Sequence, residues 1–170
     1  MTNGLQYGVS YTYSKSLGVS NADFGGVSLY FPMRQRNYGP LGYDIRHMLS
    51  VNYNYEVPNL GKKYNNRYLG LVTDNWQLSG ITTFMTGTPF TPGFSTSDGQ
   101  DITGSQEGAY INVLSDPSLP SGERTFGRNF KTEAFGRPAQ RTFGNAGINI
   151  MRNPSWSNWD MSISKRIPVR

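Results

Sequence analysis

Polar and apolar residues alternate strictly in two stretches of the chain. In residues 5–14 the odd positions are Leu5, Tyr7, Val9, Tyr11 and Tyr13, whereas the even positions are small or polar. The same alternation returns over residues 49–57. Successive side chains of a β-strand point to opposite faces, so each stretch predicts a strand with a tyrosine-rich apolar face and a polar face. Such strands are typical of a transmembrane β-barrel, in which lipid contacts one face and water the other.

Two further stretches extend this pattern and bring the expected long strands to residues 5–14, 47–57, 75–86 and 158–167. Each is close to the length that a tilted strand needs to cross a bilayer. The third is the least regular, because Ile81 and Met85 fall on its polar side. The pattern predicts an all-β fold, an antiparallel transmembrane β-barrel segment of about four long strands with long extracellular loops.

The connections between these strands differ in length. The first and third, residues 15–46 and 88–157, are much longer than the second, residues 58–74. Barrels of the outer membrane place long loops outside and short turns in the periplasm, so the first and third connections are expected to share the outer side. Aromatic side chains gather at the headgroups of a membrane. Those expected at the lipid interfaces are Tyr11, Tyr13 and Trp159 on the outer side and Tyr53, Tyr55 and Trp76 on the inner side.

The composition supports a membrane barrel over a soluble domain. Hydrophobic residues make up only 36% of 170 residues, with 20 glycines and 10 prolines, and the mean hydropathy is −0.53. This is little for a globular core, yet the 14% of aromatic residues argues against disorder. A barrel needs few apolar residues, because only every second strand residue faces lipid. No apolar run is long enough for a transmembrane helix. The expected location is the cell outer membrane of a Gram-negative bacterium.

Charge and cysteine content exclude several other classes. The net charge is +5, but the basic residues, Arg36 among them, are scattered and are expected on solvated loops. No stripe or motif for nucleic acid is present, so we expect no nucleic-acid partner. The absence of cysteine excludes disulfides and thiolate metal sites. Residues 1–4 lack the features of a signal peptide, so we expect an upstream part of the protein to precede this chain.

The third connection has features of its own. Residues 109–114 are a candidate short strand above the membrane. A Phe-Gly pair occurs at Phe126–Gly127, Phe135–Gly136 and Phe143–Gly144, and each pair is expected to form a tight turn anchored by a buried ring. No linker composition marks a second domain, so residues 1–170 are expected to form one partial barrel.

Three segments in order resemble a known family. They are residues 43–58 (Tyr-Asp-Ile-Arg-His, then a strand that ends Tyr-Glu-Val-Pro), residues 75–90 (beginning Asn-Trp-Gln-Leu-Ser-Gly) and residues 143–165 (with Arg-Asn-Pro at 152–154). Together they resemble the late barrel strands of Oar-like TonB-dependent outer-membrane transporters, and the resemblance covers residues 4–169. The resemblance implies that the chain is the C-terminal part of such a barrel, and we expect a fragment without plug, signal peptide or final strands.

The resemblance implies a barrel of about 22 strands whose lumen holds an N-terminal plug. It also implies uptake of a large substrate, energised through TonB by the inner-membrane proton motive force. The expected partners are outer-membrane lipid, the remaining strands and the plug of a full-length transporter, and TonB only through parts outside these residues. The lumen-facing polar residues are Gln6, Ser10, Thr12, Asn52, Asn54, Glu56, Gln77, Asp160, Ser162 and Arg166. Contact with the plug, a path for substrate and plain hydration of an aqueous wall all remain open for them.

Candidate chemistry is sparse. His47 with Asp44 could form a general base or half of a metal site, but zinc needs three or four protein ligands, and local hydrogen bonding at the start of a strand is the favoured interpretation. No nucleophile elbow is present. The acidic loop residues Asp98, Asp101, Glu107 and Asp116 lack the spacing of a calcium loop. We therefore expect no enzyme activity, no catalytic residue, no metal and no cofactor.

Two other functions compete with transport. The first is a structural or adhesive surface protein of the outer membrane whose third connection binds a partner. The second is a soluble β-sandwich, which would bury Val, Ile and Leu between two sheets. The tyrosine- and tryptophan-rich faces make the sandwich the least favoured of the three.

Overall fold

The computed structural model describes residues 4–19, 30–95, 102–105, 107–125 and 127–167. The chain divides into two compact units. We call residues 1–13, 46–86 and 155–170 the sheet unit, and residues 14–45 and 87–154 the loop unit. Within the described residues, no helix is both long and apolar enough to cross a bilayer.

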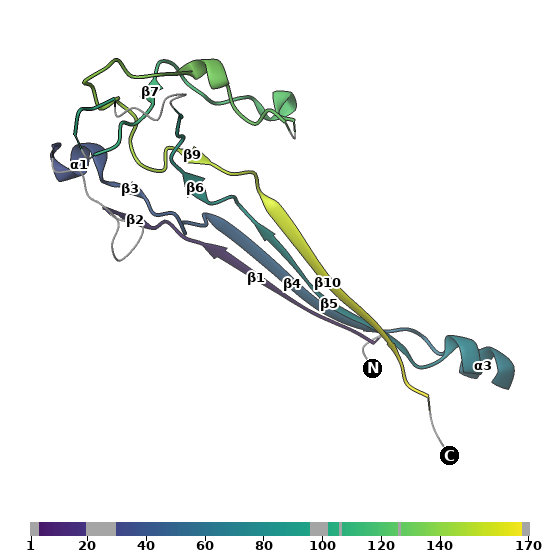
Figure 1. Cartoon of the computed structure of the whole chain (residues 1–170). Helices are drawn as coiled ribbons and strands as arrows, with labels where there is room; N and C mark the ends of the chain where they lie inside the picture. The colour runs from purple at the N-terminus through teal and green to yellow at the C-terminus, as the bar shows by residue number, and fades with distance from the viewer. Residues whose placement is uncertain (1–3, 20–29, 96–101, 106, 126, 168–170) are drawn as a thin grey trace. The chain divides into compact units, whose positions relative to one another are not determined.

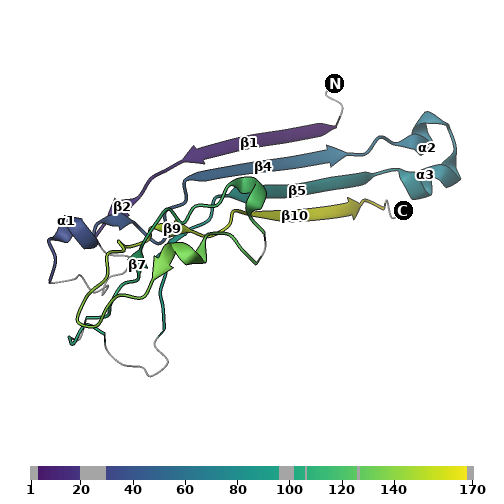
Figure 2. The same ribbon diagram turned by 90° about the horizontal axis from the view of Figure 1, so that it is seen from above.

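The sheet unit contains four long strands, which lie side by side in Figures 1 and 2. They are β1 (Leu5–Tyr13), β4 (His47–Glu56), β5 (Trp76–Met85) and β10 (Trp156–Lys165). Their order is β1-β4-β5-β10, and every neighbouring pair is antiparallel. The positions of the first three strands agree with the prediction to within one residue at each end. The fourth begins two residues earlier than expected, because the ladder continues until Trp156 meets Met85, the last residue of β5.

The register places residues of one kind on one face. Residues directly opposite each other in an antiparallel pair share a face of the sheet. Two of the apolar rows across the four strands are Tyr7–Tyr53–Gly80–Met161 and Leu5–Tyr55–Leu78–Ile163. Tyr7 and Ile163 are 73% and 68% exposed, and the described residues of the sheet unit contain no second sheet. The apolar face is therefore left uncovered, unlike that of a sandwich.

Two short helices connect β4 to β5, where the sequence predicted only a short connection. They are α2 (Leu60–Lys63) and α3 (Arg67–Thr73). The Asn66 side chain caps α3 by accepting the backbone N–H of Tyr68 at 3.0 Å and of Leu69 at 3.1 Å. α2 and α3 touch at Gly61, where an added Cβ would lie 2.1 Å from the Cα of Gly70. Helices this short leave too little apolar periodicity in the sequence to be predicted.

The loop unit is built from short elements. They are the strand pairs β2 (Leu17–Gly18) with β3 (Gly39–Pro40), β6 (Pro89–Phe90) with β9 (Met151–Arg152) and β7 (Asn112–Val113) with β8 (Phe135–Gly136), the helix α1 (Met33–Arg36), and the 3₁₀ helices η1 (Ser121–Glu123) and η2 (Thr132–Ala134). The buried apolar residues of the described chain all belong to this unit and are Ile102, Ile111, Leu119, Ala134 and Ala146.

The expected features of the third connection are found in part. β7 lies inside the candidate strand 109–114. Phe135–Gly136 is strand β8, so the prediction of a turn there was wrong, because backbone pairing with β7 holds it extended. Gly144 has a φ of +73°, but residues 143–144 form no hydrogen-bonded turn, and the Phe143 ring, which packs against Tyr30 and Phe31, is only half-buried. Phe126 lies outside the described residues.

Candidate functional site: a two-faced sheet and a clamped loop unit

The apolar face of the sheet is rich in aromatic rings. Near the C-terminal end of β1 the Tyr11 hydroxyl lies 2.8 Å from Nδ1 of His47, and the Tyr13 ring centroid lies 5.2 Å from that of His47. Further along, the rings of Phe84 and Trp159 meet edge to face at 5.9 Å. Such pairs add specific aromatic contacts to a surface that is otherwise open.

The predicted interface aromatics differ in how near they lie to the strand ends. Tyr13 ends β1, Tyr55 is the penultimate residue of β4, and Trp76 begins β5. Tyr53 and Trp159 each lie three residues inside their strands, Trp159 because β10 begins at residue 156 rather than 158. Their place at a lipid headgroup region stays a prediction.

The register brings together the predicted polar residues on the strands. Gln6, Ser10, Thr12, Asn52, Asn54, Glu56, Gln77, Asp160 and Ser162 share the face opposite the apolar rows. Gln77 donates a hydrogen bond from Nε2 to Oδ1 of Asn54 at 2.7 Å. Arg166 follows β10 and, with Glu56, Gln77 and Ser164, lines a cavity of about 350 Å³ at one end of the sheet. The contact of this face with a lumen stays a prediction.

One apolar row on the polar face was not predicted from the sequence. Met48, Met85 and Trp156 lie opposite one another near the end of the sheet where β1 finishes. Of these three residues the alternation marks only Met85 as irregular, and only the cross-strand register places it in a row with Met48 and Trp156. The polar face is therefore apolar at this end.

His47 and Asp44 have separate partners. The His47 backbone N–H donates to Oγ1 of Thr86 at 3.1 Å, and its ring contacts the Tyr11 hydroxyl. Asp44 is fully buried and forms an ion pair with Arg152. His47 is thus held by hydrogen bonds to Tyr11 of β1 and to Thr86, the residue after β5, which are distant in the sequence and not local as expected.

The Asp44–Arg152 ion pair joins the three segments that carry the family resemblance. Arg152 donates to the backbone oxygens of Asp44 at 3.0 Å and Gly87 at 3.1 Å, in addition to the Asp44 carboxylate. The next residue, Asn153, donates its backbone N–H to Thr88 O at 2.9 Å. A buried carboxylate requires such charged and hydrogen-bonded partners, so this contact clamps the ends of two long connections together.

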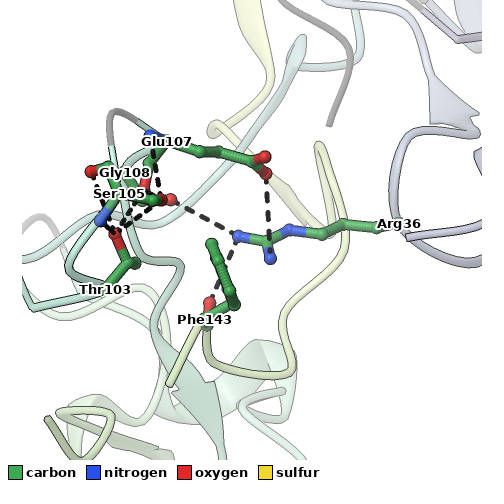
Figure 3. Close-up of polar contacts among 6 residues, drawn as sticks. All are labelled: Arg36, Thr103, Ser105, Glu107, Gly108 and Phe143. Carbon is green, nitrogen blue, oxygen red and sulfur yellow. Dashed lines mark hydrogen bonds and ion pairs between the residues drawn. The ribbon is translucent and has the colours of Figure 1, made fainter. Parts of the chain in front are cut away.

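Arg36 is a buried cation that was wrongly expected on a solvated loop. It is only 4% exposed, and its guanidinium carbon lies 3.9 Å from the Tyr110 ring centroid and 5.5 Å from that of Phe143. Nη2 donates to Phe143 O at 3.2 Å, and Nη1 lies 4.0 Å from the Glu107 carboxylate (Figure 3). Aromatic faces and carbonyl oxygens replace the water molecules that would otherwise solvate the guanidinium. The sequence around Arg36 does not reveal these partners.

Hydroxyl groups shape the turn that presents Glu107 to Arg36. Thr103 Oγ1 donates to Glu107 O at 2.8 Å and accepts from the backbone N–H of Ser105 at 3.1 Å (Figure 3). Ser105 Oγ in turn accepts from the backbone N–H of Glu107 at 3.2 Å. Side-chain hydroxyls thus hold this loop segment where no ladder pairs it.

The acidic loop residues do not gather into one site among the described residues, where no group of three His, Asp or Glu could hold a metal. Glu107 faces Arg36, and Asp116 accepts the backbone N–H of Ser118 at 2.9 Å, which lowers the pKa of the Asp116 carboxyl. The pKa of the Glu133 carboxyl is also lowered. The main cause is a hydrogen bond from the backbone N–H of Glu133 itself, and the Arg128 guanidinium contributes more weakly. Asp98 and Asp101 lie outside the described residues.

An antiparallel sheet with one uncovered apolar face and one polar face is the arrangement of a membrane-spanning β-protein. The comparison with known families agrees: residues 1–170 match the family described as outer membrane beta barrel domain, and the chain belongs to this family. Its location is therefore the outer membrane of a Gram-negative bacterium. No curated protein and no solved structure matches the chain.

The two faces can be distinguished by chemical labelling. Because the chain has no cysteine, Val9→Cys and Ser10→Cys place single thiols on opposite faces of β1. In outer membranes made permeable to small solutes, a charged maleimide that cannot enter lipid is expected to label the thiol at position 10. The thiol at position 9 should stay unlabelled, because lipid covers it. Equal labelling of both would contradict the two-faced wall.

The Asp44–Arg152 clamp predicts a large effect for one substitution. Arg152→Met leaves the buried Asp44 carboxylate without its cation, which costs on the order of 3 kcal/mol. We expect faster limited proteolysis within residues 87–154. The matched control is Arg128→Met, whose pair with Glu133 is exposed to water (56% and 62%) and should contribute little. Equal protease sensitivity of the two variants would refute the clamp.

The Arg36 contacts predict that lysine cannot replace arginine. Arg36→Lys keeps the charge but loses the planar group that stacks on Tyr110 and bonds Phe143 O, for an expected loss of about 1–3 kcal/mol. Arg34→Lys, in the same helix but exposed, is the control and should be neutral. Hydrogen exchange of residues 103–110 measures the difference, and similar exchange in both variants would argue against the role of Arg36.

Proposed function

We propose that this chain forms part of the barrel wall and external loops of a TonB-dependent transporter, which takes up a large substrate by energy-coupled transport. Its partners in this role are outer-membrane lipid, the remaining barrel strands and a plug domain. TonB would act through parts of the transporter other than these strands. No enzyme activity, cofactor or nucleic-acid partner belongs to this proposal.

The observation that carries the proposal is the small size of the side chains over much of the polar face, away from the Met48–Met85–Trp156 row. Two of its rows are Ser10–Ser50–Thr83–Asn158 and Gln6–Asn54–Ser79–Ser162. In a barrel of about eight strands, inward side chains must fill the interior, which short side chains such as serine cannot do. A wall of small polar residues suits a wide barrel, whose lumen holds water or a plug.

The edges of the sheet support a wall with further strands. In the described sheet, β1 and β10 each have one strand neighbour. Unpaired backbone groups cost several kcal/mol each in lipid, so the outer edges of β1 and β10 need partner strands. A barrel with more strands than these four satisfies that need.

A structural or adhesive surface protein is the second candidate. The observation that favours it is the loop unit, which has a buried core and two buried charged groups, Asp44 and Arg36, with partners of their own. A loop unit with a core can present a fixed surface to a binding partner. In this case the polar face would still be a wetted wall, but no plug would contact it.

A photo-crosslinking experiment separates the two candidates. Ser10→Cys carrying a benzophenone maleimide is expected to cross-link a plug domain in native outer membranes, because Ser10 lies on the polar face. Val9→Cys, on the apolar face, is the matched control and should cross-link lipid alone. Mass spectrometry identifies the products. The adhesive function is favoured over transport if two results are obtained together. The label at position 10 cross-links no plug domain, and substrate uptake is the same in cells with and without TonB.

A further inference from the structure

The helix α3 exposes an apolar face that no described residue covers. Tyr68, Leu71 and Val72 are 83%, 65% and 67% exposed. Their spacing of three and four residues places them on one side of the helix. Leu69, Gly70 and Thr73 occupy the other side and are half-buried.

This exposed face belongs to a firmly held structure. Asp74 is buried and accepts the backbone N–H of Gly61 at 2.7 Å and of Lys62 at 3.2 Å, which ties the start of α2 to the end of α3. The close contact of Gly61 with Gly70 leaves no room for a side chain at position 61, so the two helices pack backbone to backbone. The apolar side chains are therefore displayed by a fixed hairpin of two helices.

Two residues of the apolar sheet face hold the end of α3. Trp76 Nε1 donates to Val72 O at 2.7 Å, and Lys165 Nζ donates to Val72 O at 2.9 Å and also to Leu71 O. Trp76 and Lys165 lie opposite each other in register, on the same face as the Leu78–Ile163 pair. Lys165 also lies 5.1 Å from the Trp76 ring centroid. The end of α3 is thus attached on the apolar side of the sheet.

Basic residues lie on the same hairpin as this apolar face. Lys62 and Lys63 lie on α2, and Arg67 begins α3 beside Leu71; all three are exposed. Apolar side chains with flanking cations are the pattern of helices that lie in a membrane interface, where lysine and arginine contact lipid phosphates. Figure 2 shows α2 and α3 at the end of the sheet, beyond β4 and β5.

We propose that the α2–α3 hairpin lies in the membrane–water interface and binds anionic phospholipid. Tyr68, Leu71 and Val72 enter the boundary between headgroups and acyl chains, by about 5–10 Å. The cations of α2 and of the start of α3 contact the phosphates. The hairpin extends the lipid-facing surface of the sheet sideways along the bilayer. This inference rests on the outer-membrane β-barrel family, not on TonB-dependent transport.

Single labels on the full protein test this proposal. The chain has no cysteine, so Leu71→Cys and Lys63→Cys can each carry an NBD fluorophore, and Val9→Cys provides the reference for the lipid face. The protein is studied in nanodiscs excised from the native outer membrane. For the label at position 71 we expect a blue-shifted emission that a doxyl-labelled fatty acid quenches and iodide does not. For the label at position 63 we expect quenching by iodide.

The outcomes separate this inference from the barrel wall. If the lipid probe quenches the label at position 9, but the label at position 71 behaves as that at position 63 does, the hairpin lies in water and the inference is wrong. If neither position 9 nor position 71 meets lipid, the wall itself fails and the inference fails with it. Neither result depends on a plug or on TonB.

A charge reversal tests the lipid class. The protein is reconstituted into phosphatidylcholine vesicles with or without phosphatidylglycerol. The blue shift of the label at position 71 should increase with phosphatidylglycerol, and Lys62→Glu with Lys63→Glu should abolish that increase. Arg34→Glu, in the loop unit, is the matched control and should leave it unchanged. An increase that survives reversal at both lysines would refute the phosphate contacts.

Discussion

The cross-strand register of β1, β4, β5 and β10 is the constraint on which the membrane-facing surface depends. Side chains alternate with a period of two, so a slip of one residue in any pair would turn a strand's apolar side to the polar face. In the observed register Val9, Val51, Thr82 and Trp159 form one row, and Ser10, Ser50, Thr83 and Asn158 form the next. One face can then contact lipid while every paired backbone group remains bonded within the sheet.

The loop unit depends on a different interaction, which is the burial of charged groups with matched partners. Asp44 with Arg152, and Arg36 with its rings and carbonyls, hold together segments distant in the sequence. A small apolar core of residues such as Ile111 and Leu119 provides limited hydrophobic stabilisation. Specific polar contacts therefore fix much of the conformation of this unit, as expected for long connections with little regular secondary structure.

The helical connection between β4 and β5 is fixed to the sheet by polar contacts. Asp74 closes the helical hairpin, and Trp76 with Lys165 fixes its end to the apolar side. Lysine at the end of an apolar strand is explained by this contact: its ammonium meets the last carbonyls of α3, where the helix dipole favours a cation. The sequence alone offers lysine no partner, because Leu71 lies 94 residues before it.

Alternation predicted the four long strands and their two faces, because a period of two is a local property that needs no partner, and together with the composition it indicated the outer-membrane class. Tertiary structure alone decided the pairing of Trp156 with Met85, the burial of Arg36 and the partner of Asp44. These depend on residues far apart in the chain, and the desolvation of a charge is set by what surrounds it in space. The helices α2 and α3 were also missed, since their stability comes from Asp74 and the Gly61 contact rather than from a periodic pattern.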